Sequence, residues 1–352
     1  MMLAPSNVRC HALAGCAAAL LIALAACAPA PTQTAAATAP VGRPTERTPV
    51  PLPLAAPFDA AQVELSGLAW HGDTLILLPQ YPDRVGGLLA LPRQALLDVI
   101  EGRTTAALVP RKIPLDDGGL ARTLPGFEGF EAIAIIGDQL YLTIERRRGP
   151  NDMVGALVAG ALAADDSAAR LDAPTRQDVP AQAPLDNLSD EAIAVFGDRL
   201  LTFYEANGAA VNAKPVAHLF DTAGGLRAAG TLPAATLEYR LTDATPADAD
   251  GRFWVINYQF PGDAAKLKPA PDALAARFGQ GESHARCPQV ERLVELRATA
   301  QGVALTETPP VQLTLLNCQT ARNWEGLVVL PGRGFLLATD SFPGTILAFV
   351  PR

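Results

Sequence analysis

The sequence has no excess of positive charge and few charged residues of either sign. Its 352 residues include 28 Lys and Arg against 36 Asp and Glu, which gives a formal net charge of -8. This balance excludes a protein whose main function is to hold the phosphate backbone of nucleic acid by charge. Charged residues make up 18% of the chain and hydrophobic residues 49%, so an intrinsically disordered protein is also excluded.

Several motifs of well-known catalytic sites are missing. The sequence has no Gly-x-Ser-x-Gly nucleophile elbow, no Gly-x-x-x-x-Gly-Lys phosphate loop and no Rossmann glycine motif after a strand. Its four histidines and five cysteines show neither His-x-x-x-His nor Cys-x-x-Cys spacing, which are common in zinc sites. Serine-nucleophile, P-loop and zinc chemistry are therefore disfavoured.

A targeting segment occupies the N-terminus, although no later stretch has the ~20 apolar residues of a membrane-spanning helix. Residues 1–26 carry one charge, followed by a short apolar run, and are typical of a signal peptide. They end in Leu-Ala-Ala before Cys27, which resembles the lipobox of bacterial lipoproteins. The resemblance implies lipidation of Cys27 and anchoring in the cell envelope, facing the periplasm, with Ala28 favouring the outer membrane. In the alternative, the segment is an ordinary secretory signal and Cys27 is incidental.

Residues 27–55 are rich in Ala, Pro and Thr and show no hydrophobic period, so we expect an extended tether. Beyond the signal peptide and Cys27, two cysteines remain, Cys287 and Cys318. In an oxidising periplasm we predict a disulfide between them, in preference to a reactive pair or a metal site.

Internal repetition is the main signal for the fold. Residues 131–145 and 191–205 are identical at eight of fifteen positions, and each reads as an apolar strand, a Gly-Asp turn and a second apolar strand. This pattern predicts a tight β-hairpin. Weaker copies begin at Ser66, Asp243 and Glu325, so the sequence contains five such hairpins.

Repeats of this length, each headed by a buried hairpin, are typical of the four-stranded antiparallel blades of a β-propeller. We therefore predict an all-β domain over residues 56–352 with five blades. A sixth, degenerate blade between the fourth and fifth hairpins is the alternative. Because the last repeat is too short for a whole blade, we expect residues 58–65 to supply the strand that closes the ring.

Three hairpins begin with similar motifs: Gly-Phe-Glu-Ala-Ile at 129–133, Ser-Asp-Glu-Ala-Ile at 189–193 and Asn-Trp-Glu-Gly-Leu at 323–327. In these motifs the chain resembles the phytase-like domain family described as having esterase-like activity, which is similar to the gluconolactonase and strictosidine synthase propellers. The resemblance implies a propeller and a hydrolase, although propellers host many functions. The first and fourth repeats depart from the motif, with Ser66 and Asp243 in place of Glu.

Each hairpin has an oxygen-bearing side chain at both ends. With the turn midway, the two ends meet at the same end of the sheet, so a propeller would gather them at one mouth of its central channel. Oxygen ligands favour calcium, and after it magnesium, over zinc or copper. In the alternative, these acids only end strands in solvent or cap the backbone. The predicted calcium ligands are Glu131, Glu145, Glu191, Glu205, Asn257, Glu325 and Asp340.

Together with the resemblance to the phytase-like family, these acids imply a calcium-dependent hydrolase of phosphoesters, esters or lactones, in which Glu191 or Glu131 accepts a proton from water. The run Arg146, Arg147 and Arg148 beside the acids could contact a phosphate or carboxylate, or could be a solvated face paired with acids. We expect a monomer that acts on a small or phosphorylated molecule and binds no nucleic acid. The alternative function is a non-catalytic propeller that binds a partner or small ligand at the envelope.

Overall fold

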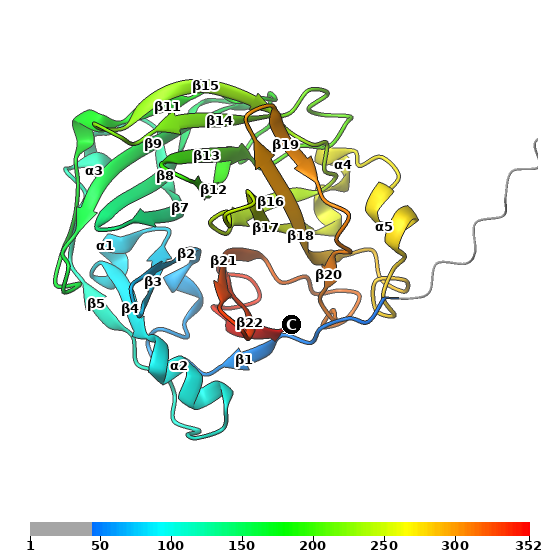
Figure 1. Cartoon of the computed structure of the whole chain (residues 1–352), viewed down its shortest axis with the longest axis horizontal. Helices are drawn as coiled ribbons and strands as arrows, with labels where there is room; N and C mark the ends of the chain where they lie inside the picture. The colour runs from blue at the N-terminus through cyan, green and yellow to red at the C-terminus, as the bar shows by residue number, and fades with distance from the viewer. Residues whose placement is uncertain (1–43) are drawn as a thin grey trace, which may run out of the picture. The chain divides into compact units, whose positions relative to one another are not determined.

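A computed structural model of the chain describes residues 44–352. The predicted signal peptide, Cys27 and the first part of the predicted tether lie outside the described residues. From residue 44 onward, the chain forms five sheets set around a common centre, all antiparallel except for one short parallel pair in the second sheet (Figure 1). This arrangement confirms the predicted all-β, five-bladed propeller. Within the same range, no helix is both long and apolar enough to cross a membrane.

Each blade begins at the centre of the ring and runs outward (Figure 1). The innermost strands are β2 (Leu65–His71), β7 (Phe127–Ile136), β12 (Asp190–Phe196), β16 (Arg240–Ala244) and β21 (Trp324–Leu330). The second strands, which complete the repeated hairpins, are β3 (Thr74–Pro79), β8 (Gln139–Gly149), β13 (Arg199–Tyr204), β17 (Arg252–Gln259) and β22 (Gly334–Thr339). The third strands are β4 (Leu88–Pro92), β9 (Asp152–Leu162), β14 (Val216–Asp221), β18 (Val290–Thr299) and β23 (Leu347–Pro351).

The outermost strands are β5 (Arg111–Ile113), β10 (Ala169–Leu171), β15 (Arg227–Pro233), β19 (Gly302–Leu305) and β1 (Val50–Leu52). Three short strands extend the larger blades: β6 (Leu115–Asp116) pairs with β10, β11 (Gln177–Val179) with β9, and β20 (Val311–Gln312) with β18. The helices are all short and lie in the connections. They are η1 (Ala61–Val63), α1 (Pro82–Val85), α2 (Arg93–Ile100), α3 (Leu120–Thr123), η2 (Ala173–Thr175), η3 (Pro261–Asp263), α4 (Ala264–Leu267) and α5 (Ala273–Phe278).

The six-bladed alternative is wrong. The connection between β17 and β18, where an extra blade would have to begin, holds η3, α4 and α5 and no strand. Asp272 caps α5, because its carboxylate accepts hydrogen bonds from the backbone N–H groups of Leu274 and Ala275.

The strand that closes the ring lies earlier in the chain than the sequence suggested. β1 pairs with β23, with Val50 opposite Phe349 and Leu52 opposite Leu347, whereas the expected segment, residues 58–65, contains η1. Residues 44–55 therefore hold a strand of the propeller, although their composition resembles a tether. Proline is tolerated here because β1 is an edge strand. Glu46 also contacts the fold, since it accepts hydrogen bonds from Ser283 Oγ at 2.8 Å and interacts with His284 Nδ1 at 2.9 Å.

The predicted disulfide between Cys287 and Cys318 is present. It joins the end of the long connection before β18 to the segment that leads into β21, across a separation of 31 residues. In a loop-entropy account, a link over such a loop stabilises the fold by about 3.7 kcal/mol.

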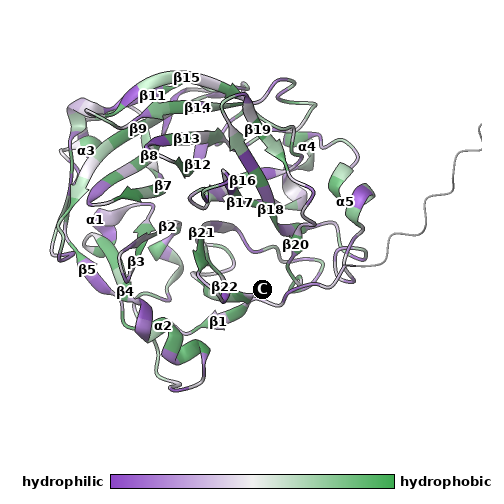
Figure 2. Ribbon diagram, in the orientation of Figure 1, coloured by the Kyte–Doolittle hydropathy of each residue, from purple (hydrophilic) through white to green (hydrophobic). Residues whose placement is uncertain are grey.

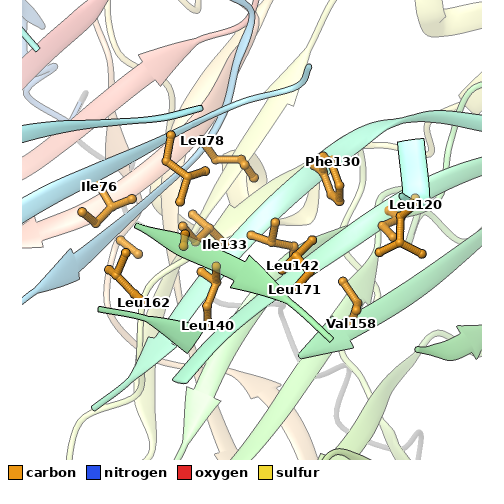
Figure 3. Packing of buried hydrophobic residues seen from close by; sticks show 14 of the residues in the cluster. Ile76, Leu78, Leu120, Phe130, Ile133, Leu140, Leu142, Val158, Leu162 and Leu171 are labelled. Carbon is orange, nitrogen blue, oxygen red and sulfur yellow. The ribbon is translucent and has the colours of Figure 1, made fainter. Parts of the chain in front are cut away.

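The blades are held together by apolar side chains between neighbouring sheets. Figure 3 shows one such cluster between the first two blades, in which Ile76 and Leu78 of β3 lie near Ile133 of β7 and Leu140 of β8. Hydrophobic colour runs along strands of every blade in Figure 2. The inner strands approach closely at Gly67, where a Cβ atom would lie 3.0 Å from Ile133 Cγ2. This packing fixes the inner hairpins and hence the groups at their ends.

Candidate active site at the channel mouth

The five inner strands share a feature that the sequence did not reveal. In each of them the pairing with the second strand slips at the position that heads the repeat. In β12, for example, Asp190 pairs with Tyr204 and Ala192 with Phe203, which leaves Glu191 in a β-bulge. A bulge turns a side chain away from the regular alternation of the strand. The residues within the five irregularities include Ser66, Glu131, Glu191, Asp243 and Glu325.

Six of the seven predicted ligands lie together as three pairs. The pairs are Glu131 with Glu145, Glu191 with Glu205, and Glu325 with Asp340. In each pair, the second residue is the charged neighbour that most raises the pKa of the first. The pairs also interact with one another, since the charges of Glu325, Glu145 and Glu131 raise the pKa of Glu191 as well. The first two pairs are buried, and Glu325 and Asp340 are partly exposed. The second, third and fifth blades thus bring their acids to one mouth, as the hairpin geometry predicted.

Burial and mutual repulsion favour the protonated forms of these carboxyls. Both effects, burial first, raise the pKa values of Glu131, Glu191 and Glu325 well above the usual range. The pKa of Glu145 rises to about 8, because burial and the charges of Glu205 and Glu128 outweigh the nearby Arg240 and Arg147. In addition, Glu145 Oε1 and Glu205 Oε2 are buried without a hydrogen-bond partner in the described chain. The cluster therefore needs protons or a cation to be stable.

The main buried counter-charge is Arg240, the first residue of β16, which sequence reasoning missed. Its Nη1 atom lies 2.7 Å from Glu205 Oε1, and its Nε atom lies 2.9 Å from Asp263 Oδ2. Lys266 Nζ is 3.9 Å from Asp263 Oδ1. The only sequence signal for Arg240 was its position three residues before Asp243, at the start of a repeat.

Two amide side chains hold the acids in place. Gln80 Nε2 donates to Glu131 Oε1 at 3.1 Å. Asn323 Nδ2 donates to Glu325 Oε1 at 2.5 Å and to Asp340 Oδ2 at 3.0 Å, and so joins that pair. The Oδ1 atom of Asn323 is buried and has no partner among residues 44–352.

The fourth blade does not supply ligands in the predicted way. Asn257 is fully buried, donates to the carbonyl oxygens of Glu238 and Arg240, and accepts from Arg292 Nε at 2.8 Å. Its amide thus joins neighbouring backbone and Arg292, so the prediction that Asn257 is a ligand is not supported. Asp243 likewise binds backbone, because it accepts the N–H of Leu327 at 2.6 Å. In the fourth blade, the acid of the repeat therefore binds the backbone, as the alternative to the metal site expected.

The arginine run beside the mouth is paired with acids. Arg146 Nη1 lies 3.0 Å from Asp178, and Arg148 Nη2 lies 2.8 Å from Asp152. Arg147 binds Glu128 at 2.6 Å and also contacts Asp186. All three guanidinium groups thus have carboxylate partners, which favours a charge-paired face over an anion-binding site.

The oxygen atoms at the mouth are of the type that binds a hard cation, but they are not arranged as a preformed metal site. Carboxylate and amide oxygens, several of them buried without partners, are the groups that calcium prefers. Across the described residues, however, no three His, Cys, Asp or Glu side chains are already close enough to form a metal site. A cation would therefore have to draw the carboxyls together and displace their protons.

A pocket of about 310 Å³ opens beside the acids. It lies at the same end of the propeller, because Arg240 and Asn323 line it and also contact the acid pairs. Phe260 and Phe342, which line it too, are 42% and 50% exposed. The other lining residues are Asn187, Tyr258 and Asp263.

Comparisons with known proteins find only distant likenesses. No protein-family model matches the chain, and no curated protein matches it. Similar solved structures include a glucose dehydrogenase, with 13% identity, a TM-score of 0.43 and coverage of 87% of this chain and 99% of that chain. The soluble aldose sugar dehydrogenase from Escherichia coli has 12% identity and a TM-score of 0.42, covering 87% of this chain and 100% of its own. A thermostable family-43 glycoside hydrolase has 11% identity and a TM-score of 0.46, covering 85% and 91%. Likenesses at this level carry no argument about the activity of this chain.

Proposed function

We propose that this protein is a calcium-dependent hydrolase of the phytase-like type, acting on an ester, lactone or phosphoester at the channel mouth. The observation that carries the proposal is the set of three carboxyl pairs, two of them buried, with too few basic groups to balance them. A fold gains nothing in stability from gathering ionised carboxyls, because each raised pKa represents the cost of burying the charge and of placing it beside like charges. Clusters of this kind are candidates for function.

The residues of the mouth divide into two roles. Glu325 and Asp340, joined by Asn323, and Glu145 and Glu205 would hold the cation through their carboxylate oxygens. Calcium bound there would supply a positive charge that polarises the scissile oxygen.

Glu191 or Glu131 would accept the proton of the attacking water. Either side chain must be ionised to act as this base, although burial and neighbouring acids raise both pKa values. A positive charge nearby lowers the pKa of a carboxyl, so cation binding and the ionised base support each other. In the proposed setting, the protein is lipid-anchored through Cys27 and faces the periplasm.

The first test is calcium titration of the chelated protein, followed by thermal unfolding. A bound ion should raise the free energy of unfolding by about 2.7 kcal/mol at a hundredfold excess over Kd. Glu191→Gln keeps the shape of a protonated glutamate, so the calcium-free protein should still fold while the calcium shift shrinks. Asp198→Asn, at an exposed Gly-Asp turn, is the matched control and should keep the full shift.

Hydrolysis of a panel of p-nitrophenyl esters, a lactone and p-nitrophenyl phosphate, with calcium and with chelator, is the second measurement. The proposal requires activity that calcium supports and that either Glu191→Gln or Glu131→Gln removes. If neither calcium nor Glu191→Gln changes the melting temperature, and no substrate of the panel is cleaved, the acids are structural. The non-catalytic binding propeller then becomes the better description.

A further inference from the structure

The pocket beside the acids has an apolar rim that the proposed chemistry does not explain. Five large hydrophobic side chains are exposed in the described part of the chain, and two of them, Phe260 and Phe342, line this one pocket. They come from different blades, since Phe260 follows β17 and Phe342 follows β22. Burying a phenylalanine is favourable, so a pair left exposed around a pocket is a candidate contact for an apolar ligand.

The backbones of Phe260 and Phe342 are hydrogen-bonded to residues that contact the charged groups of the mouth. The backbone N–H of Asp263 donates to the carbonyl oxygen of Phe260 at 3.0 Å, and Asp263 is an ion-pair partner of Arg240. The N–H of Asn323 donates to the carbonyl oxygen of Phe342 at 3.1 Å, and Asn323 also joins Glu325 to Asp340. The rim therefore has a defined position relative to the acids. Arg240 and Asn323, which contact the acids, line the same pocket as the two rings.

The charges around the pocket argue against an anionic ligand. Arg240 is paired with Glu205 and Asp263, and Lys266 lies near Asp263 and donates to the carbonyl oxygen of Asp186. Arg147 is paired with Glu128 and Asp186. A phosphate needs free cationic donors, and these three side chains are already engaged with acids or backbone. A ligand without net charge avoids repulsion from the carboxyls and can use the apolar rim.

The size of the pocket limits the apolar group. Its volume of about 310 Å³ is roughly ten times the ~30 Å³ that one water molecule occupies in the liquid. It can therefore hold a group of about ten non-hydrogen atoms.

We propose that the substrate is a neutral ester or lactone whose apolar group, of up to about ten non-hydrogen atoms, lies against Phe260 and Phe342. This inference rests on the proposed hydrolase function for the reaction itself. In that reaction, water adds to the carbonyl carbon and the bond to the ester oxygen breaks, with the proton of water passing to that oxygen. An ester gives a carboxylic acid and an alcohol, and a lactone gives a single hydroxy acid. The apolar contact gives the specificity, and the acids give the chemistry.

Binding separates this inference from the hydrolase proposal, because it needs no turnover. Nonan-2-one carries a heptyl chain on a methyl ketone and lacks a leaving group, so it reports on the pocket alone. We compare it with heptylammonium and heptyl phosphate by isothermal titration calorimetry, with calcium and with chelator. Nonan-2-one should bind in both conditions and more tightly than heptyl phosphate, and butan-2-one should bind at least tenfold more weakly.

Variants of the rim give the decisive comparison. Phe260→Ala and Phe342→Ala should each weaken nonan-2-one binding by about tenfold, because each removes a large apolar contact. Both side chains are partly exposed, so their loss should leave folding intact. Leu316→Ala is the matched control, since Leu316 is 53% exposed and lies outside the pocket; it should bind like the parent.

Two results would overturn the inference: tighter binding of heptyl phosphate or heptylammonium than of the ketone, or unchanged affinity in both Phe variants. Loss of hydrolysis with intact ketone binding would instead remove the hydrolase proposal and leave the apolar site standing. In an active protein, the Phe variants should raise KM for p-nitrophenyl octanoate by about tenfold more than they raise KM for the acetate ester.

Discussion

Glu191 illustrates how one extra residue in a strand changes local chemistry. Without the bulge, its side chain would alternate with those of its neighbours on the faces of β12. With the bulge, it meets Glu205 and the acids of two other blades. The raised pKa values that result belong to the cluster of carboxyls and not to any single one, because interacting carboxyls titrate together.

The raised pKa of Glu145 predicts how stability depends on pH without calcium. Its pKa is about 8 in the folded state against about 4.5 when unfolded, so only the folded state holds this proton between those values. Stability should therefore fall as pH rises from about 4.5 to 8, by up to about 1.4 kcal/mol per pH unit for one such group. Glu145→Gln should make this slope shallower. The measurement is urea unfolding of the chelated protein from pH 5 to 8.

Calcium provides the internal control for this prediction. If the ion binds at the mouth, it holds the carboxyls ionised and should flatten the slope in the parent. Asp198→Asn should keep the parental slope in both conditions. A slope that Glu145→Gln leaves unchanged would mean that Glu145 is ionised in the folded state at neutral pH.

At the scale of elements, the blades are joined by polar contacts as well as by apolar packing. His71, at the end of β2, lies 2.5 Å from Asp166 and 3.0 Å from Asp138, both of which belong to the second blade. Burial lowers the pKa of His71, but its interactions with the two aspartates outweigh burial and raise the pKa above 6.5. Asp138, the aspartate of the Gly-Asp turn between β7 and β8, thus joins two blades.

This contact predicts a second pH effect. A raised folded pKa means that the stabilisation is complete below pH 6.5 and is lost as pH rises through the folded value. His71→Gln should cost no more than about 1–2 kcal/mol at pH 6, because Asp138 is exposed and its contribution is screened. The cost should be smaller at pH 9, because the interactions with the two aspartates weaken once the imidazole loses its proton. Thermal unfolding at the two pH values tests this. An equal loss at both would show that His71 is neutral in the folded protein.

At the scale of the whole molecule, ring closure depends on a strand from the N-terminal side. A chain that begins at residue 56, the boundary expected from composition, lacks β1 and the buried side chain of Leu52. Compared with a chain that begins at residue 44, it should lose about 3–5 kcal/mol of unfolding free energy. Equal denaturation midpoints and slopes for the two chains would show that β1 contributes nothing to closure.

Anchoring of the molecule is the second prediction at this scale. If Cys27 is lipidated, Cys27→Ala should release the protein from the membrane fraction or stall its processing. Cys16→Ala lies in the predicted signal peptide and should leave fractionation unchanged. Membrane association of Cys27→Ala equal to that of the parent would contradict the anchor.

The sequence by itself determined the hairpins, their number and the end at which their acids meet. It could do so because strand alternation and turn residues are local, and because a repeat places equivalent residues at equivalent ends, as with Glu131, Glu191 and Glu325. The cysteine pair was readable for a similar reason, since only Cys287 and Cys318 remained after the N-terminal segment.

Only the tertiary structure decided which groups surround those acids. Asp263, Phe260 and Phe342 reach the mouth through connections whose path depends on long-range packing, and no local pattern marks them. Arg240 begins β16, but only the packing of the blades shows that it meets Glu205. The same holds for the closing strand, because β1 forms by pairing its backbone with the free edge of β23 and needs no hydrophobic pattern of its own. The bulges could not be predicted from the sequence either. A one-residue shift in register is a property of two paired strands, so the sequence of one strand does not reveal it.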